Sequence, residues 1–495
     1  MRVLPGILQR LTPLAVICCS ALTFGCDGLT AGQTLWIRLS VPVSSYSAKP
    51  GDAVHAILIE AVNCGNEVVF PVGTGIDGVV HSVRKVGWGI YHETAALDLR
   101  FDRAVVMGGS PLAISASVVE VENAREQVSS KGLIQGIRSS DTPEGTINSR
   151  LRHLPTYNPY SDMGLIVYKA TFPIFPEPEI YFPAGTDLRL KLTDPVHSLP
   201  REPALPVESM PETGEELDVE RMAPSLPWRS TTAKLVDADV VNLAFVGDRE
   251  QVKAAFQQAG WSTSDPFTKH SFFRDFYAYL NNSGYAQAPM KTLLLDGKPA
   301  DMSWQKSLNS YNRRDHLRMW QWAETSDSQT IWLSSSTHDT RATLSVKHHQ
   351  FVHHIAPDID DERSKVIRDL ELAGCVKSVH LVPRSGMSNF TQNANGDVVR
   401  TDGELAVVQL KTCQPLVPGL PSSTAGVNFK AGNHVFRYFR RQILTFRSDI
   451  WRANFIYGAY DLVRMSVEAF RHHPTPSPSQ QVKADPRALQ IAGSQ

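Results

Sequence analysis

The side chains best suited to proton transfer or metal binding gather in one segment, residues 336–369. The segment reads STHDTRATLSVKHHQFVHHIAPDIDDERSKVIRD and contains five histidines and six acidic residues. Histidine titrates near neutral pH, and histidine and carboxylate groups are common protein ligands for divalent metals. If the protein has a reactive site, the sequence places it in this segment.

Two kinds of chemistry fit these residues, and the sequence leaves both open. In a metal-free form, His338 is a general base that a carboxylate orients, and Arg363 holds an anionic substrate. In a metal-dependent form, a divalent cation converts bound water into a nucleophile. The ligands of that cation would come from both ends of the segment: His338, Asp339, His353, and Asp358 or Asp360.

Backbone geometry limits these combinations. Successive residues of a regular strand point to opposite faces, so His353 and His354 cannot both face one site. His338 and Asp339 are expected at a strand-to-turn junction, and His316 begins another predicted strand that would meet them across the sheet. A purely structural explanation competes, because the acidic residues before the helix predicted over 360–373 are also what a helix N-terminus favours.

The N-terminus predicts export. Arg2 and Arg10 precede the uncharged run 11–24. This run is too short for a membrane-spanning helix, which needs about 20 residues. A basic start, a brief apolar middle and small residues after it are typical of a secretory signal, here residues 1–31. Cleavage near Ala31 and lipoprotein cleavage before Cys26, with acylation of that cysteine, remain alternatives. Both predict a protein in the periplasm or anchored on the periplasmic side of a membrane.

The composition narrows the classes of partner. The formal net charge is -1, and the chain lacks a basic stripe, so nucleic acid is not an expected partner. No Walker or dinucleotide-binding loop is present, so no nucleotide is expected. Envelope proteins or a membrane surface are the expected partners, and a divalent metal is the one cofactor considered. In an oxidising compartment, Cys375 and Cys413 would be able to form a disulfide.

Residues 32–196 have the pattern of a β-barrel or β-sandwich. Short alternating runs are separated by Gly, Pro and Asn, as turns require. A Pro-x-Gly-Thr turn occurs twice, at 71–74 and 183–186, which indicates two similar hairpins. Through this repeated turn and the short strands around it, the region resembles the β-barrel domain of type IV secretion and conjugation core-complex proteins. That resemblance implies a barrel and an envelope setting.

The remaining chain divides into four parts. Residues 197–232 are rich in proline and acidic side chains and are predicted to be a linker. Residues 233–432 alternate helices with mostly antiparallel strands, so the predicted fold class is multidomain, with an α+β domain after the all-β domain. Residues 433–472 are predicted as basic, partly aromatic C-terminal helices that dock on the protein, a partner or a membrane surface. Residues 473–495 read as a disordered tail.

Five blocks of the second domain carry a resemblance to a known family. In order they are VNLAFVGDREQVKAAFQQAGW, MSWQK, RRDHLRMW, SSSTHDTRATLS and FVHHIAPDIDDERSKVIRDL. The chain resembles the LssY carboxy-terminal domain family over residues 239–374. A longer version of the same resemblance ends at residue 462. The family resemblance implies a bacterial envelope setting and a shared site, without a defined reaction. Many members have His-Arg where this chain has His353-His354, so the family pattern favours His353.

Two functions of different class follow. The preferred prediction is a non-enzymatic envelope module for binding or assembly. The alternative is an envelope hydrolase or phosphodiesterase, with or without a metal, whose site lies around His338 and His353. Convergence of His316, His338, Asp339 and His353 in one pocket would favour chemistry, and their separation on different faces would favour binding.

Overall fold

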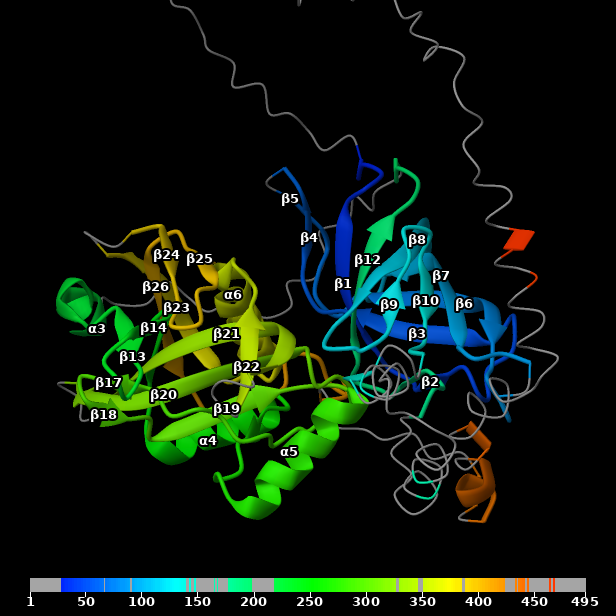
Figure 1. Cartoon of the computed structure of the whole chain (residues 1–495). Helices are drawn as coiled ribbons and strands as arrows, with labels where there is room; N and C mark the ends of the chain where they lie inside the picture. Colours follow the sequence, from blue (N-terminus) through cyan, green and yellow to red (C-terminus); the bar gives the residue numbers. More distant parts are fainter. Residues whose placement is uncertain are drawn as a thin grey trace, which may run out of the picture.

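The computed structural model describes residues 28–65, 67–89, 91–138, 177–197, 218–325, 329–345, 350–384 and 388–422, with short pieces between 142 and 167 and between 432 and 467. Figure 1 shows two domains side by side, a barrel built by the first part of the chain and an α+β domain built by the second. Cys26, nearly all of the predicted signal, most of the predicted C-terminal helices and the tail lie outside the described residues. Those assignments stay predictions.

Six strands of the first domain close into a barrel, which decides between the barrel and the sandwich. Their order is β6-β3-β1-β12-β8-β7, and β6 also pairs with β7, which completes the ring. Alternate residues such as Leu35, Ile37 and Leu39 are buried, as expected when one face of each strand fills the barrel. The six strands are β1 (Thr34–Leu39), β3 (Ala53–Leu58), β6 (Gly75–Arg84), β7 (Ala96–Val105), β8 (Leu112–Val121) and β12 (Asp187–Leu192). Shorter strands accompany them: β2 (Val43–Ser44), β4 (Val62–Cys64), β5 (Glu67–Phe70), β9 (Gln127–Val128), β10 (Leu133–Gln135) and β11 (Tyr181–Phe182).

The two Pro-x-Gly-Thr segments form the same turn, but the prediction that each belongs to a hairpin is wrong. The strands before the turns, β5 and β11, pair with β4 and β2, and the strands after them, β6 and β12, pair with other barrel strands. The threonine hydroxyl donates to the carbonyl of the proline three residues earlier, at 2.7 Å in 71–74 and 2.8 Å in 183–186. The glycines have φ of 92° and 89°, a conformation that other residues rarely adopt. Each glycine N–H donates to a strand carbonyl, from Leu58 and Leu39 respectively, so both turns are tied to the barrel wall.

The second domain is built on an eight-stranded sheet. The strand order is β16-β19-β20-β21-β15-β26-β23, with β22 paired to the free stretch of β21. These pairings are antiparallel except that of β15 with β26. The strands are β15 (Leu243–Val246), β16 (Ser262–Thr263), β19 (Met302–Lys306), β20 (Arg314–Glu324), β21 (Thr330–Ser345), β22 (Gln350–Ile355), β23 (Val376–Pro383) and β26 (Glu404–Leu410).

Helices α4 (Arg249–Gln258) and α6 (Ile359–Leu372) pack into one core with this sheet, and α5 (Lys269–Asn281) lies beside it. The backbone N–H of Gln251 donates to the Asp248 carboxylate at 2.7 Å, so α4 begins at the predicted cap. The core contains large side chains from both layers: Phe245, Phe256, Trp304, Trp332, Val366 and Leu370. No helix among the described residues is long and apolar enough to cross a membrane.

The linker prediction is too long at its C-terminal end. Residues 218–231 form α3 (Asp218–Met222), a 3₁₀ turn η2 (Ala223–Ser225) and β13 (Arg229–Thr231). Ala223 and Leu226 are buried in a second core with Trp320, so this stretch folds with the α+β domain despite its prolines. Two small sheets complete the domain: β14-β13-β17-β18, which adds β14 (Asp237–Val240), β17 (Leu294–Leu295) and β18 (Lys298–Pro299), and the hairpin of β24 (Phe390–Gln392) and β25 (Val398–Arg400).

Strand β21 departs from the sequence-based expectation in a way that matters for the site. Two strands with a turn between them were expected over 330–346, with His338 and Asp339 at the junction. The structure has one strand through that region, paired with β20 over its first part and with β22 over its last. Of the polar residues that suggest a turn, Thr337 and Asp339 are buried, His338 is half-buried and Thr340 is exposed.

A disulfide joins Cys375, directly after α6, to Cys413, which follows β26. The two Cα atoms are 4.0 Å apart. The two cysteines proposed as partners from the sequence are therefore bonded in the structure, and the bond fixes the end of α6 against the last strand of the sheet.

Candidate functional site

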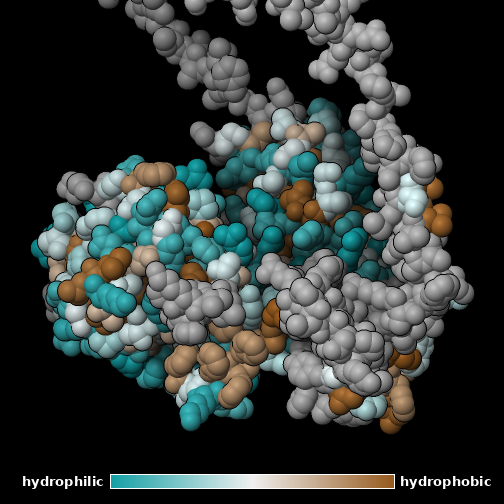
Figure 2. Space-filling model, in the orientation of Figure 1, coloured by the Kyte–Doolittle hydropathy of each residue, from teal (hydrophilic) through white to brown (hydrophobic). Residues whose placement is uncertain are grey.

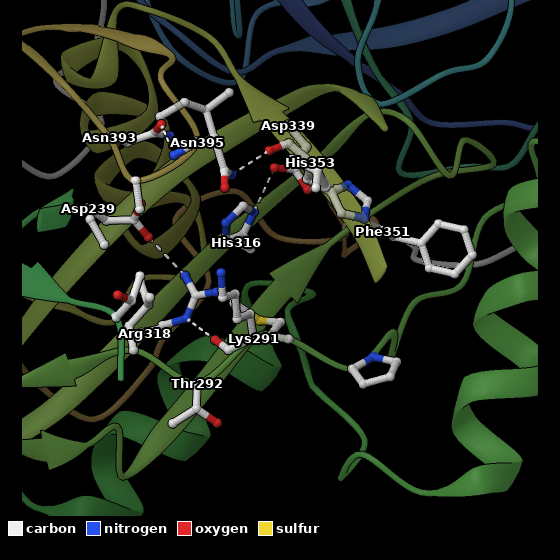
Figure 3. Close-up of a pocket in the computed structure, with 18 of the residues that line it drawn as sticks. Asp239, Lys291, Thr292, His316, Arg318, Asp339, Phe351, His353, Asn393 and Asn395 are labelled. Carbon is white, nitrogen blue, oxygen red and sulfur yellow. Dashed lines mark hydrogen bonds and ion pairs between the residues drawn. The ribbon is translucent and has the colours of Figure 1, made fainter. Parts of the chain in front are cut away.

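A cavity of about 330 Å³ opens on one face of the sheet, over β20, β21 and β22. Alternate residues of β20 point into it, namely Arg314, His316 and Arg318. Asp339 from β21 and His353 from β22 complete the floor, and Figure 3 shows these side chains together with the residues around them. The remaining wall comes from the start of α5, the segment 289–293, β14 and the turn of the β24–β25 hairpin.

Asp339 is the centre of the floor and is 0% exposed. Its carboxylate is 2.8 Å from Arg314 Nε, 3.0 Å from His353 Nδ1 and 3.5 Å from His316 Nδ1. Burial by itself raises the pKa of Asp339, but the neighbouring His316, His353 and Arg314 outweigh it and hold that pKa well below its ordinary value. The carboxylate is therefore ionised, and it lies within ion-pair distance of two imidazole rings.

The two histidines of the floor differ in their surroundings. Burial lowers the pKa of His316 to about 3, so this ring is neutral at pH 7. Its Nε2 lies 2.9 Å from the Thr337 hydroxyl, which completes its hydrogen bonding on that side. The His353 side chain lines the cavity and is 16% exposed. Of the two rings, His353 is the one placed to meet a ligand.

Arg318 lies deeper in the cavity and is already engaged. Its guanidinium donates to Asp239 at 3.0 Å and to the backbone carbonyl of Lys291 at 3.1 Å, as Figure 3 shows. Burial lowers the pKa of Arg318 and raises that of Asp239, and their mutual attraction acts against both shifts. Because Arg314 pairs with Asp339 in the same way, each buried arginine of the cavity has its own carboxylate.

Aromatic side chains form the rim. Phe267, Phe272 and Phe351 line the cavity, and Phe267 is 75% exposed. Behind Phe351, a ring cluster with Tyr279 and Tyr311 reaches His353, whose ring centroid is 5.2 Å from that of Tyr311. Figure 2 shows hydrophobic colouring over the part of the surface that α5 forms in Figure 1. The entrance is thus apolar and the floor polar.

His338 lies on the opposite face of the sheet, because it directly precedes Asp339 on a regular stretch of strand. Its Nδ1 is 2.6 Å from Asp315 Oδ1, and Asp315 is likewise the neighbour of Arg314 and His316 on β20. Burial alone lowers the pKa of His338, but the hydrogen bond and the charge of Asp315 outweigh it and raise the pKa. The structure therefore does not bring His338 to His353, as a shared metal site requires.

The face that carries His338 is the interface with the barrel, and it is made of buried charges. Lys306 Nζ is 2.9 Å from both oxygens of Asp369, which also lies 3.6 Å from Arg38 of the barrel. Arg38 in turn pairs with Asp187 of the barrel at 2.6 Å. A second group contains Lys365, which is 3.1 Å from Asp315, 3.0 Å from Asp369 and 3.4 Å from Glu122 of the barrel.

Glu122 and Glu362 are the acids of this interface that resist ionisation. Burial raises the pKa of Glu122 to about 7, against the opposing charge of Lys365. Burial, reinforced by Asp315, also raises the pKa of Glu362 well above its ordinary value. Glu362 is 3% exposed, and its Oε1 receives no hydrogen bond from the described residues.

Three residues proposed from the sequence have structural roles away from the cavity. Asp358 is the N-cap residue of α6 but makes no side-chain cap. Asp360 accepts hydrogen bonds from the Thr401 hydroxyl and from the backbone N–H of Asp402. Arg363 forms a two-pronged ion pair with Asp402, at 2.9 and 2.6 Å. These contacts anchor α6 to the β25–β26 connection. The expected helix cap is absent, because the Asp358 side chain accepts no hydrogen bond from the first turn of α6.

Pairing of a histidine Nδ1 with an aspartate is common in this chain. It occurs at His55–Asp77 in the barrel, at His338–Asp315, at His353–Asp339 and at His354–Asp397. Only the third of these pairs lies in the cavity among the described residues. An aspartate beside a histidine is therefore weak evidence for catalysis in this protein.

Sequence reasoning missed several functional candidates. Arg314, Arg318 and Asp239 line the cavity, and Asp315 and Glu362 accompany His338. The sequence contains one signal for these residues. In the strand RRDHLRMW, Arg314, His316 and Arg318 alternate and therefore share one face, whereas Asp315 lies on the other face. The acids and bases of the interface have no comparable local signal, because most of their partners lie far along the chain, either in the same domain or in the other one.

Comparisons with known proteins address the two halves separately. A search of curated proteins finds no match. Among solved structures, the chain is similar to ComB10 of the Com Type IV secretion system of Helicobacter pylori, with 13% identity, a TM-score of 0.21 and coverage of 36% of this chain and 94% of that chain. Residues 220–405 match the family model described as LssY C-terminus, so the second half of the chain contains an LssY C-terminal domain, as its five sequence blocks predicted.

Proposed function

We propose that this chain is a binding module of the bacterial cell envelope, whose LssY C-terminal domain holds a small uncharged ligand in the cavity over β20, β21 and β22. The envelope address rests on the secretory pattern of residues 1–31. The ligand rests on one observation: the cavity combines an aromatic rim with a polar floor of His316, Asp339 and His353, of which the His353 side chain is 16% exposed.

The charges of the floor indicate what kind of ligand fits. Arg314 and Arg318 are each neutralised by a carboxylate, so neither arginine is free to hold a strong anion. Two imidazoles and the Asp339 carboxylate instead present both donors and acceptors. A ligand with hydroxyl or amide groups can both donate and accept hydrogen bonds at such a floor without bringing a charge. The aromatic rim favours an apolar face on the same ligand, a combination that sugars possess.

Replacing Phe267 by serine tests the rim. We expect the dissociation constant for the uncharged disaccharide of two N-acetylglucosamine units to rise roughly tenfold, since covering an aromatic ring contributes about 1–2 kcal/mol. Isothermal titration calorimetry on the full chain measures it. The matched control is Phe390→Ser, which removes another exposed phenylalanine outside the cavity. Equal weakening in both variants, or no heat from the wild type, would contradict a sugar in this cavity.

Hydrolysis is the second candidate function, and one observation favours it. His353 lines the cavity with its Nδ1 3.0 Å from the Asp339 carboxylate, and an imidazole beside a carboxylate can use Nε2 as a general base that activates water. If this function holds, His353→Gln is expected to lower the rate of hydrolysis of bis(p-nitrophenyl) phosphate about 10²–10⁴-fold. His354→Gln on the other face keeps the wild-type rate. Wild-type protein that hydrolyses the ester no faster than buffer would exclude this candidate.

A further inference from the structure

Glu362 is an unusual residue in the interface between the two domains. It lies near the start of α6 with 3% exposure, and no described side chain or backbone group donates a hydrogen bond to its Oε1. A buried carboxylate is normally paired or bound to a metal, because its desolvation is otherwise uncompensated. Lys365 is the nearest cation of the network, yet its short contacts are to Asp315, Asp369 and Glu122.

The atoms around Glu362 are those that a transition metal uses. One ligand atom each from Asp315, His338 and Glu362 lies within 4.8 Å of the others. In a tetrahedral site with bonds of about 2.1 Å, ligand atoms lie roughly 3.4 Å apart, so small side-chain rotations close the remaining gap. Three ligands of this kind leave at least one coordination position for water, and His338 is partly exposed, which gives an ion a path to the site.

The surrounding residues already orient these ligands. Asp315 Oδ2 accepts a hydrogen bond from the Asn123 side chain of the barrel at 2.7 Å. The same oxygen forms an ion pair with Lys365 at 3.1 Å. Its Oδ1 is the atom that faces His338, at 2.6 Å. Outer contacts that hold a ligating carboxylate in place are typical of metal sites. Because Asn123 belongs to the other domain, an ion on Asp315 would also strengthen the contact between the domains.

We propose that Asp315, His338 and Glu362 bind a divalent transition-metal cation, zinc or manganese, at the interface of the barrel and the LssY C-terminal domain. One nitrogen and two carboxylate ligands suit these borderline to hard ions. The site lies on the opposite face of β20 and β21 from the ligand cavity. It therefore differs from a metal site that joins His338 to His353, and it is independent of the proposed function of the cavity.

Metal binding by the full chain tests the proposal. Protein stripped with a chelator and then given Zn²⁺ or Mn²⁺ is expected to retain one equivalent after desalting, as measured by elemental mass spectrometry. Glu362→Gln and His338→Gln are expected to raise the dissociation constant at least tenfold. His354→Gln is the matched control, because His354 pairs with Asp397 away from this group, and it keeps wild-type affinity.

Two further measurements keep the test decisive if a variant folds poorly. Cobalt(II) added to wild-type protein is expected to show ligand-field bands that differ from those of the aqueous ion. Added metal is also expected to raise the melting temperature of the wild type, but not that of Glu362→Gln. The proposal is overturned if neither zinc nor manganese is retained, or if Glu362→Gln binds as tightly as the wild type. If Glu362 is simply protonated and binds no metal, Glu362→Gln is expected to behave like the wild type, because glutamine has nearly the same shape as the neutral acid.

Discussion

Replacing Asp369 by asparagine is expected to lower the free energy of unfolding of the α+β domain by about 3–5 kcal/mol. Asp369 is buried and takes ion pairs from Lys306 and Lys365, at 2.9 and 3.0 Å, and a hydrogen bond from the Trp261 ring N–H at 3.1 Å. Asparagine keeps the volume but removes the charge, and its amide N–H₂ would face the two lysines. Lys306 would then lose its main counter-charge, and Lys365 would keep only Asp315 and Glu122.

Urea unfolding followed by tryptophan fluorescence measures this effect, because Trp304 and Trp332 are buried in the core of the same domain. The matched control is Glu250→Gln, which removes one partner of the exposed ion pair between Glu250 and Lys253. That change is expected to cost less than about 0.5 kcal/mol. A loss below about 1 kcal/mol for the Asp369 variant would show that the network does not depend on this carboxylate.

The second large effect is a dependence of stability on pH through His316. The pKa of its ring falls from 6.5 to about 3 on folding, because burial outweighs the attraction of Asp339, and Arg318, Arg314 and His353 act in the same direction as burial. Below pH 6.5 the unfolded chain therefore binds a proton that the folded chain does not. Stability is lost as pH falls from 6.5 toward 3, and the loss reaches about 2 kcal/mol at pH 5.

Comparison with His316→Gln isolates this contribution. The variant lacks the titrating ring, so the difference in unfolding free energy between the two proteins is expected to be constant above pH 7. It should shrink by about 2 kcal/mol on going to pH 5. Other groups cancel in the difference, including Glu122, whose pKa of about 7 makes its own contribution grow as the pH falls. Parallel curves between pH 7 and 5 would show that His316 is not held neutral by the fold.

Local patterns in the sequence predict the elements of this protein well. Alternation identifies the barrel strands, and the Pro-x-Gly-Thr repeat identifies two turns whose glycines have positive φ. The cap at Asp248 and the pairing of Cys375 with Cys413 also follow from sequence. In each case the deciding interaction is local, or involves few candidate partners.

The site is predicted only in part, for two physical reasons. Polar residues around Asp339 suggest a turn, but pairing with β20 and β22 and an ion pair with Arg314 allow a continuous strand to carry them. Once the strand is regular, His338 and Asp339 face opposite ways, and the expected four-residue group divides into His316, Asp339 and His353 on one face and His338 on the other. The charged partners of His338 come from distant segments, and no spacing rule predicts them.

The charged interface limits how this protein could be recombined. An apolar contact tolerates many partners of similar shape, whereas buried charges require an opposite charge at each position. A chimera that joins this LssY C-terminal domain to an unrelated barrel would bury Lys306 and Lys365 without Asp187 and Glu122. The barrel and its neighbour are thus specific to each other, and a successful domain swap would have to transfer the matching carboxylates along with the strands.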